Sequence, residues 1–400
     1  MRDDVVADVA SHLKPRGRPD LVLLFCYAYP PSSLPGAIRP SHFSKYLQRF
    51  GYDVKVITGT EPEAGRDEVT FVPDRCTGPN RKRMSGIAER VLRRLFFPYD
   101  AGLTWSTDVF NVAEALVRRN PNTVIFSTFP PLSTHFAALR LMRKYGVRWI
   151  ADFRDPLAGS PSRMAWQRRS FSSRTDRTVQ NIIFRHADVL IANTDTVLDR
   201  WRNEFPEFAS KMVHIWNGFD DEQMLEAAPK PARGFKVLAH VGTIYSGRHP
   251  APLLESIERL SRAGHNKVKE LLVHLVGYIA WEELPRHDLF ETMSAAGVLK
   301  ITDAVPLADA RQIMKEADYL LVLDTLFSGA GQQVPSKLYE YIPIGRPILA
   351  ITTRNSPTDR ILAGSGIRYA CIYSDSSADE ADRVQPQRRF SFAPLGQCQD

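Results

Sequence analysis

The first apolar run of the chain, L-V-L-L-F-C-Y at Leu21–Tyr27, leads directly into P-P-S-S-L-P-G-A-I-R at Pro30–Arg39. A short apolar run bounded by proline and glycine is typical of a buried strand that ends in a loop. Further strand-like runs alternate with helical patterns as far as residue 193. The alternation predicts a parallel sheet with helices on both faces. The strand-like runs are residues 21–27, 53–58, 123–127, 148–152 and 188–193, and the helical patterns are residues 40–50, 107–119, 133–144 and 178–186.

The same rhythm restarts after residue 235, which predicts a second doubly wound domain. Between the two series lie Gly218 and two prolines, in a stretch suited to a linker. We therefore expect an α/β fold of two Rossmann-like domains that face each other across a cleft. The expected parts are residues 1–217, a linker at 218–234, a second domain at 235–371 and a polar tail at 372–400. In the second series the strand-like runs are residues 236–241, 271–276, 319–324 and 347–351, and the helical patterns are residues 251–263, 308–317 and 337–342.

The composition of the chain fits a globular protein with more than one domain. Its 400 residues are 44% hydrophobic and 24% charged, and no apolar run reaches the roughly eighteen residues of a membrane-spanning helix. The first nineteen residues lack the apolar core of a signal peptide. Four widely spaced cysteines predict neither a zinc site nor a disulfide framework, so a reducing cytoplasm is the expected setting. They are Cys26, Cys76, Cys371 and Cys398.

The positive charge of the chain is concentrated in its first half. Residues 1–217 hold 32 Lys and Arg against 22 Asp and Glu, a balance of +10, whereas the whole chain carries +7. Within this half, residues 81–97 combine basic residues with apolar residues at helical spacing. Such a stretch is either a helix that lies on an anionic membrane surface or an ordinary helix whose apolar stripe enters the core.

The stretch V-P-S-K-L-Y-E-Y-I-P-I-G-R-P-I-L, residues 334–349, predicts a helix that begins near Ser336. Lys337 and Glu340 are three residues apart and share one helical face. A lysine at a helix start can bind phosphate, and a carboxylate beside it can accept hydrogen bonds from two ribose hydroxyls. The alternative is a capped surface helix with an exposed Lys–Glu pair.

Three other stretches place polar residues directly after strands. In H-V-G-T-I-Y-S-G-R-H-P, residues 240–250, two glycines precede an arginine that can clamp an anion; the alternative is an ordinary strand-to-helix turn. The loop at 30–39 carries Gly36 and Arg39, and the alternative there is a plain proline-rich loop. In A-D-F-R-D-P, residues 151–156, a carboxylate can bind an acceptor hydroxyl or stabilise a developing cation. The alternative is an Arg–Asp pair that fixes the loop.

Taken in order, these motifs resemble the retaining glycosyltransferases of family 4 with the two-domain GT-B fold, in the bacterial branch that builds surface polysaccharide. P-P-L-S-T-H-F at Pro130–Phe136 and W-N-G-F-D at Trp216–Asp220 add to the resemblance, which covers roughly residues 20–370. It implies a metal-independent transferase without a cofactor. The expected partners are a nucleotide-diphosphate sugar and a saccharide or polyprenyl-linked acceptor at the inner face of the plasma membrane.

The resemblance also implies a role for individual residues. Glu340 is expected to bind ribose, the cations at 248 and 337 the diphosphate, and the segment 303–306 the base. The expected catalytic residues are Arg248, Lys337 and Asp155. The expected donor-binding residues are Glu340, Gly36, Gly242, Gly247, Ser336, Gln332 and Val305. The expected acceptor or sugar contacts are Arg154, Arg39 and His135.

Two features depart from the family pattern. Gln332 stands where the family often has a second glutamate, and residues 372–400 do not read as the usual terminal helix. Two alternatives therefore stay open: a nucleotide-sugar epimerase of the same fold, and a non-catalytic subunit that binds nucleotide-sugar. A nucleic-acid-binding protein is favoured by charge alone, without a recognisable motif.

Overall fold

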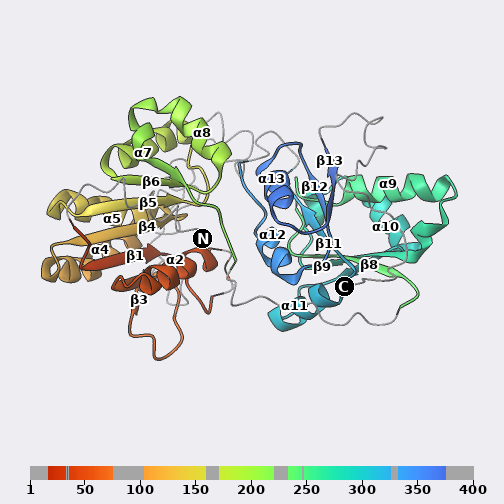
Figure 1. The fold of residues 1–400 in the computed structure, drawn as a ribbon, viewed down its shortest axis with the longest axis horizontal. Coiled ribbons are helices and arrows are strands. Elements are labelled where there is room, and N and C mark those ends of the chain that lie inside the picture. The colour runs from red at the N-terminus through yellow and green to blue at the C-terminus, as the bar shows by residue number, and fades with distance from the viewer. Residues whose placement is uncertain are drawn as a thin grey trace, which may run out of the picture. The chain divides into compact units, whose positions relative to one another are not determined.

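The computed structural model describes residues 17–32, 34, 36–74, 103–158, 171–219, 233–245, 247–325 and 332–374. The chain divides into two compact units, Met1–Gly218 and Phe219–Asp400. Each unit is an α/β layer structure built on one parallel sheet (Figure 1). The α/β class with two Rossmann-like units, predicted from the alternating pattern, is confirmed. The basic stretch at 81–97 and the tail beyond Ser374 lie outside the described residues.

The first unit contains a seven-stranded parallel sheet in the order β3-β2-β1-β4-β5-β6-β7. Its first six strands follow the doubly wound order 3-2-1-4-5-6, in which the chain leaves β1 in one direction and later returns to the other side of it. The strands are β1 (Leu21–Cys26), β2 (Val54–Thr58), β3 (Val69–Phe71), β4 (Thr123–Phe129), β5 (Arg148–Phe153), β6 (Val189–Ala192) and β7 (Met212–His214).

Both faces of this sheet are apolar, because its central strands alternate between two cores. Leu23 and Phe25 of β1 join the core under the helices α4, α5, α7 and α8, whereas Val22 and Leu24 join Phe43 of α2 on the opposite face. The continuous apolar run at the start of the chain is therefore a central strand buried on both sides. The helices are α2 (Ile38–Arg49), α4 (Leu103–Arg119), α5 (Leu132–Tyr145), α7 (Phe171–His186) and α8 (Asp195–Glu204).

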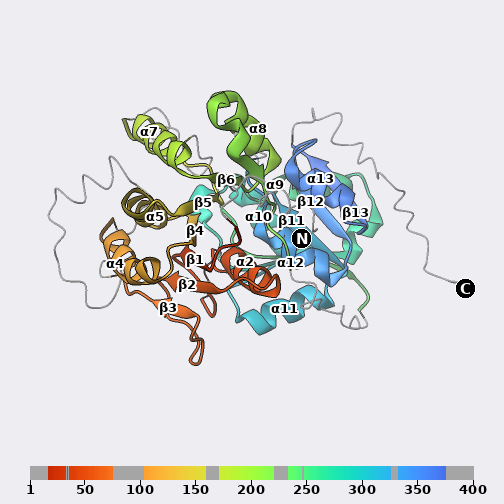
Figure 2. The same cartoon turned by 60° about the vertical axis from the view of Figure 1, so that its left-hand side comes forward.

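The second unit repeats the arrangement with six parallel strands in the order β10-β9-β8-β11-β12-β13. Figure 2 shows β12 beside β13 in this sheet. Helices α9 and α10 cover one core, while α11 packs on β8 and α12 on β11. The strands are β8 (Lys236–Val241), β9 (Leu271–Val276), β10 (Leu299–Thr302), β11 (Tyr319–Leu323), β12 (Ile348–Thr352) and β13 (Tyr369–Tyr373). The helices are α9 (Ala251–Arg262), α10 (His287–Ala295), α11 (Leu307–Glu316), α12 (Ser336–Tyr341) and α13 (Pro357–Gly364), and short 3-10 turns lie at Pro206–Lys211, Asn266–Glu270, Trp281–Glu283 and Ile342–Ile344.

The strands predicted from apolar runs agree with the structure to within one or two residues at either end. Two helices begin earlier than their patterns indicated: α4 starts at Leu103 and α7 at Phe171. Several short elements were not predicted, namely β3, β7, β10, β13, α8, α10 and α13. No helix within the described ranges has the length and apolarity needed to cross a membrane.

Candidate functional site

The strand orders place a ligand site at the same point of each unit. In a doubly wound sheet, ligands bind beyond the carboxyl ends of the strands, where the strand order reverses. That point lies between β1 and β4 in the first unit and between β8 and β11 in the second. The motifs at 30–39 and 240–250, both singled out from the sequence, lie at the carboxyl ends of β1 and β8 and therefore start at these points.

In the second unit, Lys337 lies directly against the end of β8. A Cβ atom built on Gly242 would stand 3.3 Å from Lys337 Cε and 3.4 Å from His240 Nε2. Glycine at 242 thus lets the lysine and the histidine approach the same small space. The structure brings Lys337 close to Gly242, two residues that the resemblance assigns to donor binding, and places His240 beside them.

His240 presents a buried hydrogen-bond acceptor to this space. Its Nδ1 lies 2.9 Å from the carbonyl oxygen of Leu321, which can only accept, so we assign the hydrogen to Nδ1. Nε2 then carries a lone pair, and it has no partner among the described residues. Burial lowers the pKa of His240 to about 4, and the positive charges of Lys337 and Arg248 act in the same direction. The imidazole is therefore neutral at physiological pH.

Helix α12 is held in place by Tyr341 rather than by a side-chain cap. The backbone N–H of Val241 donates to Tyr341 Oη at 2.9 Å, so the helix is tied to the last residue of β8. One turn earlier on the same face stands Lys337, which explains its position beside Gly242. Lys337 Nζ donates to both carboxylate oxygens of Glu340 at 3.0 Å, and each side chain is about one-third exposed.

Arg248 spans the reversal point of the second sheet. Its Nε donates to Thr325 Oγ1 at 3.1 Å, and Thr325 follows the end of β11. The turn that carries Arg248 contains Gly247 at φ +79°, a conformation that favours glycine. Beside it, Asp324 is buried, which raises the pKa of its carboxyl group. Arg248 and Lys337 thus both act on His240 from the carboxyl edge of the sheet.

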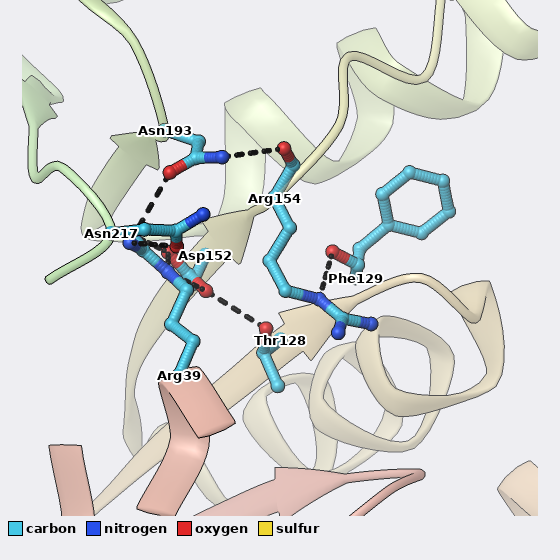
Figure 3. Close-up of polar contacts among 7 residues, drawn as sticks. All are labelled: Arg39, Thr128, Phe129, Asp152, Arg154, Asn193 and Asn217. Carbon is cyan, nitrogen blue, oxygen red and sulfur yellow. Dashed lines mark hydrogen bonds and ion pairs between the residues drawn. The ribbon is translucent and has the colours of Figure 1, made fainter. Parts of the chain in front are cut away.

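The first unit contains a buried ion pair at the corresponding edge (Figure 3). Arg39 Nη2 lies 2.7 Å from Asp152 Oδ1, and Nε donates to both carboxylate oxygens. The remaining Nη1 donates to the side-chain oxygens of Asn193 and Asn217, and Thr128 donates to Asp152 at 2.8 Å. Arg39 is 7% exposed and Asp152 is fully buried.

This network gives Arg39 a structural role that differs from the predicted sugar contact. The guanidinium of Arg39 is hydrogen-bonded to Asp152, Asn193 and Asn217. These bonds tie α2 to the ends of β5 and β6 and to residue 217. The sequence motifs raised an Arg–Asp pair as an alternative within A-D-F-R-D-P. Such a pair exists, but its arginine is Arg39, in the first turn of α2, and not Arg154.

Arg154 is the arginine at this edge that faces Gly36. Its Nε donates to the carbonyl oxygen of Phe129 at 3.2 Å, and its Nη2 donates to that of Pro130. Burial lowers the pKa of Arg154, while the carboxylates of Asp155 and Asp152 oppose this shift. A Cβ atom on Gly36 would stand 1.9 Å from Arg154 Nη1. Gly36 was predicted to approach a phosphate, and the structure shows that it leaves room for the guanidinium of Arg154.

His135 lies in the core and does not face the carboxyl edge. Its ring has no exposed surface, packs between Phe129, Trp149 and Phe153, and shares a 2.7 Å hydrogen bond with Ser127. Burial lowers its pKa to about 3. In this position the ring is out of reach of an acceptor or sugar, because the side chain points into the aromatic cluster of the first unit.

Three of the remaining predicted residues lie in the second unit, and one lies in the first. Ser336 begins α12, whose length of six residues makes Lys337 the main source of positive charge there. Gln332 precedes this helix and interacts with another part of the structure. Val305 is half-buried in the loop that follows β10. Asp155, in the first unit, is half-buried beside Arg154. No cluster of three or more metal-ligating side chains occurs within the described ranges.

Comparisons with known proteins can now be set beside this geometry. Residues 36–218 match the glycosyl transferase 4-like domain. That segment begins at Gly36 and includes the whole Arg39–Asp152 network. No curated protein matches the chain.

Solved structures match nearly the whole chain. A glycosyltransferase from Rickettsia africae is 10% identical, with 92% of this chain and 88% of that chain covered and a TM-score of 0.56. A UDP-forming α,α-trehalose-phosphate synthase from Burkholderia vietnamiensis is 12% identical, covers 90% of both chains and has a TM-score of 0.55. A putative UDP-N-acetylglucosamine 2-epimerase from Listeria monocytogenes is 10% identical, with 89% of this chain and 85% of that chain covered and a TM-score of 0.49. This likeness is too weak to favour an epimerase. The chain has a glycosyltransferase-like GT-B fold of two Rossmann-like units.

Proposed function

We propose that the protein transfers a sugar from a nucleotide-diphosphate sugar to a saccharide acceptor. The observation that carries the proposal is the pair of cations, Arg248 and Lys337, at the reversal point of the second sheet. The match of residues 36–218 to a glycosyltransferase domain favours this chemistry over other uses of an anion site. As in the sequence resemblance, we propose a retaining reaction that needs no metal ion.

Breaking the bond between a sugar and a diphosphate creates negative charge on the leaving group. A site accelerates this step when it binds the separated charges better than the substrate. Arg248 can donate two parallel hydrogen bonds to phosphate oxygens, and Lys337 adds a point charge from α12. Preorganised donors of this kind stabilise developing charge without further reorganisation.

Glu340 is proposed to bind the ribose of the donor. In the structure its carboxylate accepts from Lys337, so the pair holds both side chains beside the site before a donor binds. When phosphate draws Lys337 away, the carboxylate becomes free to accept hydrogen bonds from ribose hydroxyls. Glu340→Ala is then expected to weaken the binding of a free nucleoside diphosphate, measured by calorimetry. Unchanged affinity would remove this role.

The acceptor is proposed to meet the first unit near Arg154 and Asp155. Arg154 Nη1 faces Gly36 and forms no hydrogen bond to a described residue, so it is available to a ligand. The excess of positive charge in residues 1–217 supports an anionic, lipid-linked acceptor. Such an acceptor is consistent with polysaccharide synthesis at the cytoplasmic face of a membrane.

A screen of nucleotide-sugars by thermal unfolding tests the donor assignment. A ligand at 100 times its Kd stabilises the native state by about 2.7 kcal/mol, which gives a measurable rise in Tm. The stabilising donor is then incubated with and without saccharide acceptors, and products are separated by chromatography. Acceptor-dependent glycoside formation is the expected result. Conversion of the donor without an acceptor would indicate an epimerase, and binding without turnover a non-catalytic subunit.

A further inference from the structure

Outside the carboxyl edges, the first unit has a groove of about 640 Å³ between the outer surfaces of α5 and α7. The two helices pack side by side in both views (Figures 1 and 2). We call it the arginine groove, after the four arginines that line it. They are Arg143 of α5 and Arg174, Arg177 and Arg185 of α7.

The four arginines are exposed and have no acidic partner. Within the described part of the chain, no carboxylate forms an ion pair with any of them. The one acidic side chain of α7, Asp176, is 2% exposed and faces the core. Arg143 Nη2 lies 3.4 Å from His186 Nε2, and Arg177 stacks on Phe205. The groove therefore concentrates positive charge that the fold itself does not neutralise.

The spacing of the groove residues spreads this charge along one helical face. Residues 174, 177, 178, 181, 182 and 185 follow the i, i+3, i+4, i+7 pattern of a single stripe. Arg174 and Arg185 are eleven positions apart, which corresponds to about 17 Å of helix. One compact anion cannot contact charges so far apart, whereas several phosphate groups can. Thr178 and Asn181 add polar groups between the arginines, and Ile182 is 37% exposed.

The groove is separate from the site proposed above. Helix α5 starts after β4 and ends just before β5, so Arg143 in its last turn lies at the amino edge of the sheet. Helix α7 likewise ends just before β6, which places Arg185 and His186 at that edge. Arg39, Asp152 and Arg154 lie at the opposite, carboxyl edge. Neither the family match nor the proposed reaction gives these arginines a task.

We propose that the arginine groove binds a ligand that carries several phosphate groups, supplied by anionic lipid headgroups or by a soluble polyphosphate. Guanidinium groups bind phosphate oxygens with paired hydrogen bonds, and the exposed faces of these four are free to do so. The groove offers no exposed aromatic platform for bases, since Phe205 is 3% exposed. This favours phosphate recognition over the binding of single-stranded nucleic acid.

The test compares the full chain with two variants that each lose four positive charges. The groove variant is R143Q/R174Q/R177Q/R185Q, and the matched control is R119Q/K269Q/K300Q/R311Q, at exposed positions that do not line the groove. Both variants are expected to keep the thermal unfolding of the wild type, because none of these side chains is in a described ion pair. Because the two variants have the same net charge, a difference between them in binding is due to the groove and not to the overall charge of the chain.

Binding is measured to two probes at low salt: inorganic tripolyphosphate by calorimetry, and vesicles of phosphatidylglycerol and phosphatidylcholine by cosedimentation. For at least one probe, the groove variant should bind about tenfold more weakly or worse, and the control within about twofold of the wild type. If the groove variant loses affinity for vesicles alone, the ligand is an anionic lipid headgroup. If it loses affinity for tripolyphosphate alone, the ligand is a soluble polyphosphate.

The proposal is overturned if the wild type binds neither probe, or if the control variant loses as much as the groove variant. It is also overturned if the groove variant loses affinity only for a labelled oligonucleotide, since the ligand would then be nucleic acid. None of these measurements uses glycosyl transfer, so their outcome is independent of the proposed reaction.

Discussion

The carboxyl edges of the two sheets use charge in different ways. In the first unit, Arg39 and Asp152 are buried, and their polar atoms are bonded to one another and to neighbouring strands. In the second unit, Lys337 is partly exposed and forms an ion pair with Glu340, one turn away on the same helix. Both edges follow the same strand order, so topology alone does not decide what a charged residue there does.

The two edges should differ in the effect of removing one charged side chain. A buried ion needs its partner, since an uncompensated charge in the core is costly. A half-exposed cation is solvated by water, and its loss has little effect on folding. The first edge should therefore respond to mutation mainly in stability, and the second mainly in ligand binding and turnover.

Asp152→Ala is expected to destabilise the first unit by about 3–5 kcal/mol, because it leaves the buried Arg39 without its partner. Urea unfolding followed by the fluorescence of the fully buried Trp149 measures the change. Asp67→Ala, at an exposed carboxylate in the same unit, is the control and should shift the unfolding free energy by less than about 0.5 kcal/mol. Similar small shifts for both variants would contradict a buried structural pair.

Arg248→Ala and Lys337→Ala are each expected to lower turnover by on the order of 10²-fold while leaving unfolding nearly unchanged. The measurement is the initial rate of sugar transfer at saturating donor, with Arg262→Ala at a surface position of α9 as control. Wild-type rates for both variants would refute the phosphate clamp. A matching loss of stability would show that the second edge resembles the first.

Acid should weaken both units through their buried histidines. The pKa of His135 is lowered to about 3 and that of His240 to about 4, so both are neutral in the folded state, whereas an unfolded histidine takes up a proton near 6.5. The unfolded state then binds more protons, and stability falls as pH drops below 6.5. At pH 5 each histidine is expected to cost about 2 kcal/mol.

His135→Phe should flatten this pH dependence in the first unit, and His240→Phe in the second. Urea unfolding at several pH values, followed by amide hydrogen exchange of peptides from each unit, measures this dependence. A pH dependence that neither substitution alters would show that the two imidazoles do not control acid stability.

Gly36→Ala is expected to reduce turnover by about tenfold, because the added methyl group displaces the guanidinium of Arg154. The end of a flexible side chain can move, so the free energy of unfolding should change little. Gly364→Ala, where an added Cβ meets open space, is the matched control. Equal rates for the two variants would mean that the position of Arg154 does not matter to the reaction.

Much of the fold was predictable because the central strands are continuous apolar runs. Such runs identify β1, β6 and β11 without further information, whereas β4 and β5 include polar residues. The missed strands β3 and β7 have three residues each and lie at the sheet edges, where no run is long enough to stand out. Helix α10 follows Arg286, whose backbone is left-handed and gives no cap signal.

The candidate site was predictable only where its residues are close in sequence. Lys337 and Glu340 were paired because they are three positions apart on one predicted helix. Arg39 and Asp152 are 113 residues apart, so no local pattern could pair them. His240 drew no attention because one histidine in an apolar strand is usually a core residue, and its unpartnered nitrogen is visible only in three dimensions.

The hydrogen bond between Arg39 and Asn217 joins residues 178 positions apart. The guanidinium of Arg39 thus connects the beginning of α2 to the last residues of the first unit. The segment between these two points is nearly all of the unit's chain. Neither end of this segment can fray without first breaking a buried contact, so loosening at one end is opposed at the other. The contact therefore restrains both ends of this segment in the folded state, as a covalent cross-link would. Unlike a covalent bond, it is lost whenever the chain unfolds.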